Sequence, residues 1–119
     1  MAQHNNLGKT GEKIAQRYLE KHNYQILDTN WHFQHAEIDI IALKNNTLIV
    51  IEVKTRTSDH YGKPESFISN KKIQLLNKAI NHYIEQKNIE AEIRFDVISI
   101  IKNQYVEKIE HIKNAYHWF

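Results

Sequence analysis

The stretch that decides the fold runs from Glu37 to Lys54 and reads EIDIIALKNNTLIVIEVK. It predicts two strands rich in isoleucine and valine, joined by a two-residue turn at Asn45-Asn46, because asparagine tolerates the positive φ that such turns need. Both faces of this hairpin are apolar over most of their length, and its charges lie near the outer ends. A strand pair of this kind is expected in the middle of a sheet, with helices covering both sides.

A two-residue turn also fixes the register of the hairpin. Counting outward gives the pairs Lys44–Thr47, Leu43–Leu48, Ile41–Val50, Asp39–Glu52 and Glu37–Lys54. Directly opposed side chains lie about 5 Å apart at Cβ, so like charges in these positions repel. A divalent cation with oxygen ligands would remove the repulsion between Asp39 and Glu52. A three-residue turn would shift the register and abolish this opposition.

The composition describes an ordinary globular chain. At 119 residues we expect one domain, residues 1–119, that is large enough for a core of its own. The absence of cysteine excludes disulfides and thiolate zinc sites. No secretory signal and no apolar run of membrane length are visible, so we expect a cytoplasmic protein without a membrane partner. The net charge of +2 permits a polyanionic partner without requiring one.

Two helices are expected. Apolar residues recur at helical spacing from Thr10 to about His22, with Thr10 as the N-cap and loose polar residues up to Gly8. The second helix is capped by Ser69 and runs for about 18 residues. Between the hairpin and this helix, residues 55–66 have the composition of a loop and include the only proline, Pro64.

Further strands complete the prediction. Residues 24–27 and 30–33 read as a short strand that continues or restarts, and residues 93–101 and 105–112 as two later strands. The resulting order is α, β, β-hairpin, α, β, β, which predicts an α/β fold with a single mixed sheet flanked by two helices. The connection through the second helix favours a parallel, right-handed pairing of strand 93–101 with a hairpin strand. The aromatic tail NAYHWF either folds back on the body or forms a dimer contact.

The chemistry is expected at one end of the hairpin. Glu52 and Lys54 are two residues apart and therefore share one face of a strand, and the register adds Asp39 from the neighbouring strand. Two carboxylates bind Mg²⁺ or Mn²⁺, and an adjacent lysine can orient a water or stabilise developing charge. These parts fit the hydrolysis of a phosphodiester. The simpler alternative is an exposed strand end, with a Glu37–Lys54 ion pair and solvated acids.

Several pieces in this order resemble the PD-(D/E)xK nuclease superfamily, and more closely the YraN-like family of predicted endonucleases, distantly related to archaeal Holliday junction resolvases. The matching pieces are Gly8–Glu12, Asn30, Glu37–Ala42, Ile51–Arg56, Gly62, Lys72 and Arg94–Val97. Together they span nearly the whole chain. Two positions depart from the pattern: Ile38 stands where the superfamily has proline, and Ala36 where the family usually has glycine.

The resemblance implies an αβββαβ restriction-endonuclease-like core and a Mg²⁺- or Mn²⁺-dependent endonuclease acting on DNA, with branched DNA as one candidate substrate. Asp39, Glu52 and the Val53 carbonyl would hold the metal. Lys54 would be the catalytic lysine, and Glu12 an additional acid reaching the site from the first helix. A homodimer is expected by analogy with resolvases, which cut a junction at two strands.

Other residues have competing interpretations. Arg56 and Lys72 are candidate phosphate contacts, although lysines on a helix are usually only solvated. Glu12, in the first turn of the predicted helix, would otherwise simply complement the helix dipole. The eight histidines show no metal-ligand spacing, and Asp96 beside Arg94 is expected to be structural. Two rival functions remain open: a DNA-binding scaffold that does not cut, and a structural or protein-interaction domain.

Overall fold

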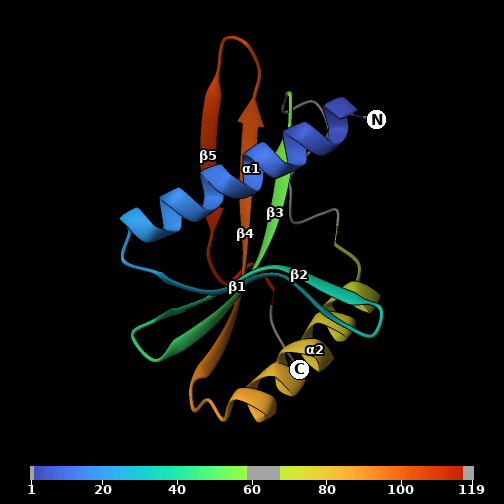
Figure 1. The fold of residues 1–119 in the computed structure, drawn as a ribbon, viewed down its shortest axis with the longest axis vertical. Helices are drawn as coiled ribbons and strands as arrows, with labels where there is room; N and C mark the ends of the chain where they lie inside the picture. The colour runs from blue at the N-terminus through green and yellow to red at the C-terminus, as the bar shows by residue number, and fades with distance from the viewer. Residues whose placement is uncertain (1, 59–67, 117–119) are drawn as a thin grey trace.

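The computed structural model describes residues 2–58 and 68–116. The elements are α1 (Ala2–Lys21), β1 (Gln25–Phe33), β2 (Ala36–Lys44), β3 (Thr47–Arg56), α2 (Asn70–Lys87), β4 (Glu92–Lys102) and β5 (Glu107–Ile112). The strands form one sheet in the order β1-β2-β3-β4-β5, and the two helices cover it (Figure 1). All neighbouring strands are antiparallel except β3 and β4, which are parallel. The predicted α/β class with one mixed sheet is confirmed, and the arrangement is consistent with a restriction-endonuclease-like core.

The hairpin has the predicted turn. Asn45 and Asn46 have φ values of 50° and 63°, as a type I′ turn requires. The pairs run from Lys44–Thr47 to Ile40–Ile51, which confirms the register obtained by counting as far as Ile40.

Alternate residues of β3 serve two separate cores. Leu48 and Val50 belong to the cluster beneath α2, and Ile49 and Ile51 belong to the cluster beneath α1. Each fully buried side chain of this size contributes about 1.5–3 kcal/mol to folding. Because both faces of β3 are covered, the strand reads as an almost uninterrupted apolar run up to the point where Glu52 begins the polar end.

The second helix and its crossover also follow the prediction. Ser69 is the N-cap of α2, and its hydroxyl accepts the Lys72 N–H at 3.2 Å. The helix ends at Asn88 in the left-handed conformation, with φ of 55°. It leads into β4, which pairs with β3 in parallel over ten residue pairs. The parallel crossover is therefore confirmed.

The start of α1 was predicted wrongly. The helix begins at Ala2 instead of Thr10, and Thr10 lies inside it. The early residues carry no apolar periodicity, but they contain no proline, and lysine and glutamine are good helix formers. Gly11 sits where α1 crosses β3, and a Cβ there would overlap the side chain of Thr55. This glycine thus serves the close approach of the helix to the sheet.

Smaller differences concern the outer strands. β1 is one strand with a register shift between Ile26 and Asp28, so a local bulge takes the place of the two short strands considered from the sequence. β5 begins at Glu107 instead of at residue 105. The Asn103 side chain accepts the N–H groups of Tyr105 and Val106, which holds those residues in the turn.

The ends of two predicted segments lie outside the described residues. The loop expected at 55–66 starts later, since β3 continues to Arg56, and residues 59–67, with Gly62 and Pro64, are not described. The tail folds back as far as Tyr116: the N–H of Ala115 donates to the Phe95 carbonyl at 2.7 Å, and Tyr116 packs against the α2 cluster. No helix in residues 2–58 and 68–116 is long and apolar enough to cross a membrane.

Candidate active site

The candidate site forms where β2 and β3 separate. Their ladder ends at the pair Ile40–Ile51, so the predicted pair Asp39–Glu52 is not part of it, and continuing the count would have paired Ile38 with Val53. Instead, the N–H of Val53 donates to Asp39 Oδ2 at 2.8 Å. Ile38 packs in the cluster beneath α2, whereas Ile40 packs beneath α1, so β2 twists around Asp39. Figure 1 shows the β1–β2 ribbon crossing β3 steeply.

This separation exposes backbone groups of β3 to the site. In a strand, the N–H and C=O of one residue point toward the same neighbouring strand. Because the Val53 N–H points to Asp39, the Val53 carbonyl points to the same edge. The assignment of this carbonyl and Asp39 to one metal site stays a prediction.

Glu52 lies on the face of β3 that α2 covers, and its side chain is only 9% exposed. Its Oε1 atom is 2.6 Å from Lys72 Nζ and 3.7 Å from Lys54 Nζ. Glu52 and Lys54 therefore share one face, as predicted. Lys72 comes from the first turn of α2, where the Ser69 cap fixes its backbone. Its direct contact with Glu52 was not predicted, because the sequence does not show how far the first turn of α2 lies from β3.

Asp39 is held in an unfavourable electrostatic environment. Its pKa is raised from 3.8 to about 7, chiefly by burial and then by the negative charge of Glu52, with smaller contributions from Glu12 and Glu37. The hydrogen bond from Val53 N–H acts in the opposite direction but does not compensate. The expected repulsion between Asp39 and Glu52 is therefore present. Three carboxylates thus act on Asp39, and of these acids only Glu52 pairs with Lys54 and Lys72.

Glu12 reaches this region from the other helix. The tight contact between Gly11 and Thr55 brings the middle of α1 against β3, and Glu12 follows directly. Its half-buried carboxylate is close enough to raise the pKa of Asp39. The alternative role of complementing the helix dipole is wrong, because α1 starts at Ala2 and Glu12 lies well beyond its first turn.

The Glu37–Lys54 ion pair of the simpler interpretation is absent. Glu37 Oε2 lies 2.9 Å from Nε2 of His32, its partner across β1 and β2, and both side chains are largely exposed. The β2–β3 pairing has ended before Glu37, so the Lys54 ammonium turns to Glu52 instead. Counting residues across the β1–β2 turn would have placed His32 opposite Glu37. The sequence did not reveal the length of that turn, so this pair was not predicted.

The two candidate phosphate contacts lie on the same side of the sheet. The half-buried Arg56 donates from Nη2 to Ser99 Oγ at 3.5 Å, on the strand beside Lys54. Lys72 is engaged with Glu52. Lys72 therefore contacts Glu52 directly, whereas Arg56 lies farther along β3, beyond Lys54. Asp96, expected to be structural, pairs with Arg94 at 2.8 Å.

The oxygen donors of the site are two carboxylates and one carbonyl. Among the described residues, no group of three or more His, Asp or Glu side chains is arranged to hold a metal ion alone. Asp39 and Glu52 use one oxygen each in the hydrogen bonds given above. Mg²⁺ needs only one or two protein carboxylates, since water and phosphate oxygens complete its shell. The donor set is therefore of the kind that Mg²⁺ takes.

The fold and this site define an α/β protein whose mixed sheet carries a cluster of acids and lysines at the point where two strands part. The chain belongs to the family described as Uncharacterised protein family UPF0102, whose profile matches residues 11–100. A UPF0102 protein of Christiangramia forsetii is 51% identical over 119 residues, covering all of both chains. One from Geobacter metallireducens is 43% identical over 118 residues, covering 98% of this chain and 97% of its own. The resemblance to the YraN-like family is confirmed by these matches.

Proposed function

We propose that this protein is a metal-dependent endonuclease of the PD-(D/E)xK superfamily that hydrolyses DNA phosphodiesters. The observation that carries the proposal is the gathering of acids where β2 and β3 part: the Val53 N–H holds Asp39 Oδ2 at 2.8 Å, next to the nearly buried Glu52, whose negative charge helps to raise the pKa of Asp39. A fold gains nothing from concentrating like charges at a buried point, whereas a site that binds a cation needs them. Lys54 lies on the same face of β3 as Glu52 and supplies the lysine that the nuclease motif requires beside its two acids.

Each residue has a definite role in this proposal. Asp39, Glu52 and the Val53 carbonyl would hold Mg²⁺ or Mn²⁺, which when bound supplies an acidified water and stabilises negative charge on the phosphate. The Lys54 ammonium orients the attacking water and donates hydrogen bonds to the phosphate oxygens. Glu12, on the α1 side, accepts a hydrogen bond from water at the edge of the site. Arg56 contacts the neighbouring phosphate of the strand.

The substrate and assembly follow from the same proposal. DNA is the expected polyanion, and branched DNA is the candidate structure that resemblance to junction resolvases favours. Resolvases cut two strands symmetrically, so the proposal includes a homodimer acting in the cytoplasm. Gel filtration with light scattering, in the presence and absence of a four-way junction, measures this directly.

A second candidate function is a DNA-binding protein that keeps the site but does not cut. The observation in its favour is the 2.6 Å contact between Lys72 Nζ and Glu52 Oε1. An ammonium at this distance neutralises the carboxylate and competes with a metal for it. In this case Lys54 and Lys72 would leave a site that attracts phosphates without activating water.

A cleavage assay separates the two candidates. Wild-type protein is incubated with labelled junction, flap, single-stranded and duplex DNA in Mg²⁺, Mn²⁺ or EDTA. The proposal expects metal-dependent cleavage that falls by at least about 100-fold in Glu52→Gln and Lys54→Ala. Glu85→Gln, on the exposed part of α2, is the matched control and keeps full activity. Binding without cleavage in either metal favours the second candidate, and cleavage that survives in Glu52→Gln contradicts the assigned site.

A further inference from the structure

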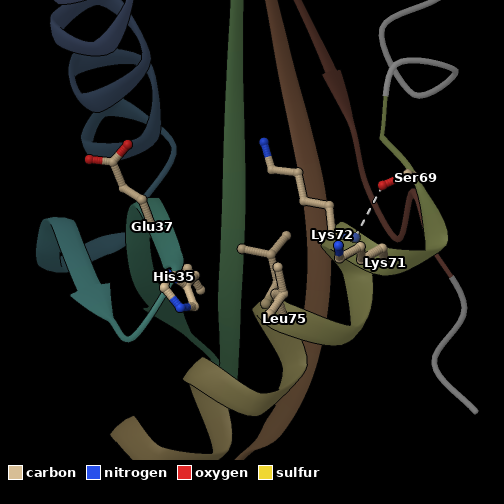
Figure 2. A pocket seen from close by; sticks show the side chains of 8 residues that line it. His35, Glu37, Ser69, Lys71, Lys72 and Leu75 are labelled. Carbon is tan, nitrogen blue, oxygen red and sulfur yellow. Dashed lines mark hydrogen bonds between the residues drawn. The ribbon is translucent and has the colours of Figure 1, made fainter.

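A cavity of about 270 Å³ lies directly beside the candidate active site. It is enclosed by the β1–β2 turn on one side and by the first two turns of α2 on the other (Figure 2). Its lining residues are His35, Ala36, Glu37, Ser69, Lys71, Lys72, Leu75 and Leu76. Lys72 belongs to both places, since its ammonium contacts Glu52. A molecule in this cavity would therefore touch a residue of the active site.

The cavity has an apolar floor and a polar rim. Ala36 and Leu76 are 6% and 3% exposed, and Leu75 is half-buried beside them. Around the opening, Lys71 and His35 are exposed. Figure 2 shows the lysines on the helix side and Glu37 on the opposite wall, where Glu37 pairs with His32. The positive charge is therefore concentrated on one side of an apolar cavity.

This distribution selects a ligand with an apolar body and an anionic end on one side. A lone phosphate ion would gain nothing from the leucine floor, and an apolar molecule would gain nothing from the lysines. A nucleotide has both parts, because its base is a flat, largely apolar ring and its phosphate is anionic. The volume lies just below the roughly 300–1,000 Å³ of pockets for drug-sized ligands, which suits one base and excludes a base pair.

We infer that this cavity receives one unpaired base of the bound DNA strand, with Lys71 and Lys72 on the adjoining phosphates. The inference rests on the proposed function and narrows its substrate to DNA that offers an unpaired nucleotide. A base inside a duplex is covered by its neighbours and its partner, so it enters a cavity only from a single strand or after leaving the stack. Junctions, flaps and single-stranded ends provide such bases at little cost.

The aromatic rings nearby do not offer an equal alternative. Trp31, Phe33 and His82 stack on one another, with the Phe33 and His82 ring centroids 4.1 Å apart. Their faces are thus used within the protein. The exposed His35 ring at the mouth of the cavity has no such partner among the described residues, and it is positioned at the opening that a base would pass.

The inference is tested by binding, without any need for cleavage. Fluorescence anisotropy in EDTA compares a short single strand with strands of the same sequence that carry one abasic residue at each position in turn. Contact with one base is worth roughly 5- to 100-fold in affinity. We expect a loss of about 10-fold when the abasic residue occupies one particular position, and weaker binding of intact duplex. Equal affinity for every abasic strand overturns the inference.

Two variants assign the effect to the cavity. Leu75→Trp fills the cavity, so it should bind the intact strand about 10-fold more weakly and no longer respond to abasic positions. Leu75→Met conserves volume and should behave as the wild type. If Leu75→Trp keeps the wild-type abasic profile, the base does not lie in this cavity and the inference fails.

A second measurement avoids dependence on the folding of a variant. Wild-type protein is titrated with thymidine 5′-monophosphate and with deoxyribose 5-phosphate, and NMR follows the His35 and Leu75 resonances. The inference expects shifts of both residues with the nucleotide and not with the sugar phosphate. Identical shifts with both compounds contradict it. If the protein binds in a base-dependent way but cleaves no DNA, the base-binding inference is supported and the proposed nuclease activity is refuted. If it cleaves DNA without base-dependent binding, the nuclease activity is supported and the inference is refuted.

Discussion

Two aspartates on different strands of the same sheet, Asp96 buried and Asp39 half-buried, lie in opposite environments. Asp96, on β4, accepts hydrogen bonds from the Arg94 guanidinium, from His111 Nε2 at 2.7 Å and from the N–H of Asn114 at 2.9 Å. Burial alone would raise the pKa of Asp96, but its bonds to His111, Arg94 and Asn114 lower it below the ordinary value. Asp39, on β2, accepts a hydrogen bond from one donor among the described residues, the Val53 N–H, and its pKa is raised to about 7.

The difference separates a carboxylate that holds the fold together from one to which we assign metal binding in the proposed function. Two residues that contact Asp96 also bind tyrosines. His111 Nδ1 is hydrogen-bonded to the Tyr18 hydroxyl at 3.0 Å, and Arg94 Nη2 donates to the Tyr24 hydroxyl at 3.0 Å. This network joins α1, β4, β5, the tail and Tyr24, which directly precedes β1, so its charges stabilise the fold. Around Asp39 the neighbouring charges have its own sign, which costs stability unless a cation joins them.

The largest expected effect is on the Asp96 side of the comparison. Asp96→Ala leaves the Arg94 guanidinium without its carboxylate and should lower the free energy of unfolding by about 3–5 kcal/mol. Urea denaturation measures the change, with Glu110→Ala on the exposed part of β5 as the control. A loss of less than about 1 kcal/mol would mean that Asp96 does not hold the network together.

The Asp39 side should respond with the opposite sign. Ionisation of Asp39 opposes folding, so its folded-state pKa of about 7 makes the penalty absent below about pH 4 and complete above about pH 7. Asp39→Asn keeps an acceptor for Val53 N–H and removes the charge. In EDTA this variant should be more stable than the wild type by about 1–3 kcal/mol at pH 8 and equal to it at pH 4. Denaturation of both proteins at pH 4 and at pH 8 measures the difference in their free energies of unfolding. The same difference at both pH values would contradict the electrostatic explanation.

The placement of Glu12 is tested through the glycine before it. Gly11→Ala puts a Cβ into the Thr55 side chain and should destabilise the fold by about 1–3 kcal/mol. Adding Thr55→Gly should restore part of the loss, since the clashing atoms are removed. The pair is measured as a double-mutant cycle by thermal unfolding. Additive effects would mean that the α1–β3 contact does not position this part of the helix.

A smaller effect is expected at Lys72. Lys72→Met removes the ammonium closest to Glu52 but preserves the unbranched stem along the helix. Because the ammonium competes with a metal for the carboxylate, Mn²⁺ affinity should rise by about 3- to 10-fold, corresponding to roughly 1 kcal/mol. Calorimetric titration measures it, with Lys78→Met on the exposed face of α2 as the matched control. An unchanged Mn²⁺ affinity would mean that Lys72 does not compete with a metal for the Glu52 carboxylate.

The smallest effect belongs to the exposed pair of His32 and Glu37. Their side chains are 65% and 49% exposed, so water and salt screen the interaction. Glu37→Gln should change the free energy of unfolding by less than about 1 kcal/mol. Thermal unfolding measures the difference, and a loss as large as that of Asp96→Ala would show that exposure does not distinguish the two kinds of carboxylate.

Much of the fold could be read from local chemistry. The Asn45-Asn46 turn fixed the register of the hairpin, and the Ser69 cap fixed the start of α2, because both depend on side chains close in sequence. The first turns of α1 were missed, since their polar sequence has no periodic apolar signal. The parting of β2 and β3 at Asp39 was also missed. Counting assumes a continued ladder, whereas the twist of the sheet ends it at Ile40.

The candidate site was predictable only in part for the same reason. Glu52 and Lys54 share a strand, so spacing placed them on one face. Lys72 and Glu12 arrive from separate helices, and only the packing of α2 and the close approach at Gly11 decide how near they lie. The Asp96 network joins residues that are far apart in the chain, so no local sequence pattern could predict the contact between Asp96 and His111.

Our main proposal is that Asp39 and Glu52 together bind a divalent cation. A crystal of the protein soaked in Mn²⁺ tests it most directly, with anomalous scattering recorded for the wild type and for Glu52→Gln. The account predicts an anomalous peak between Asp39 and Glu52, within coordination distance of the Val53 carbonyl, and no peak in the variant. Density that shows Lys72 still on Glu52 and no Mn²⁺ at this position would contradict it.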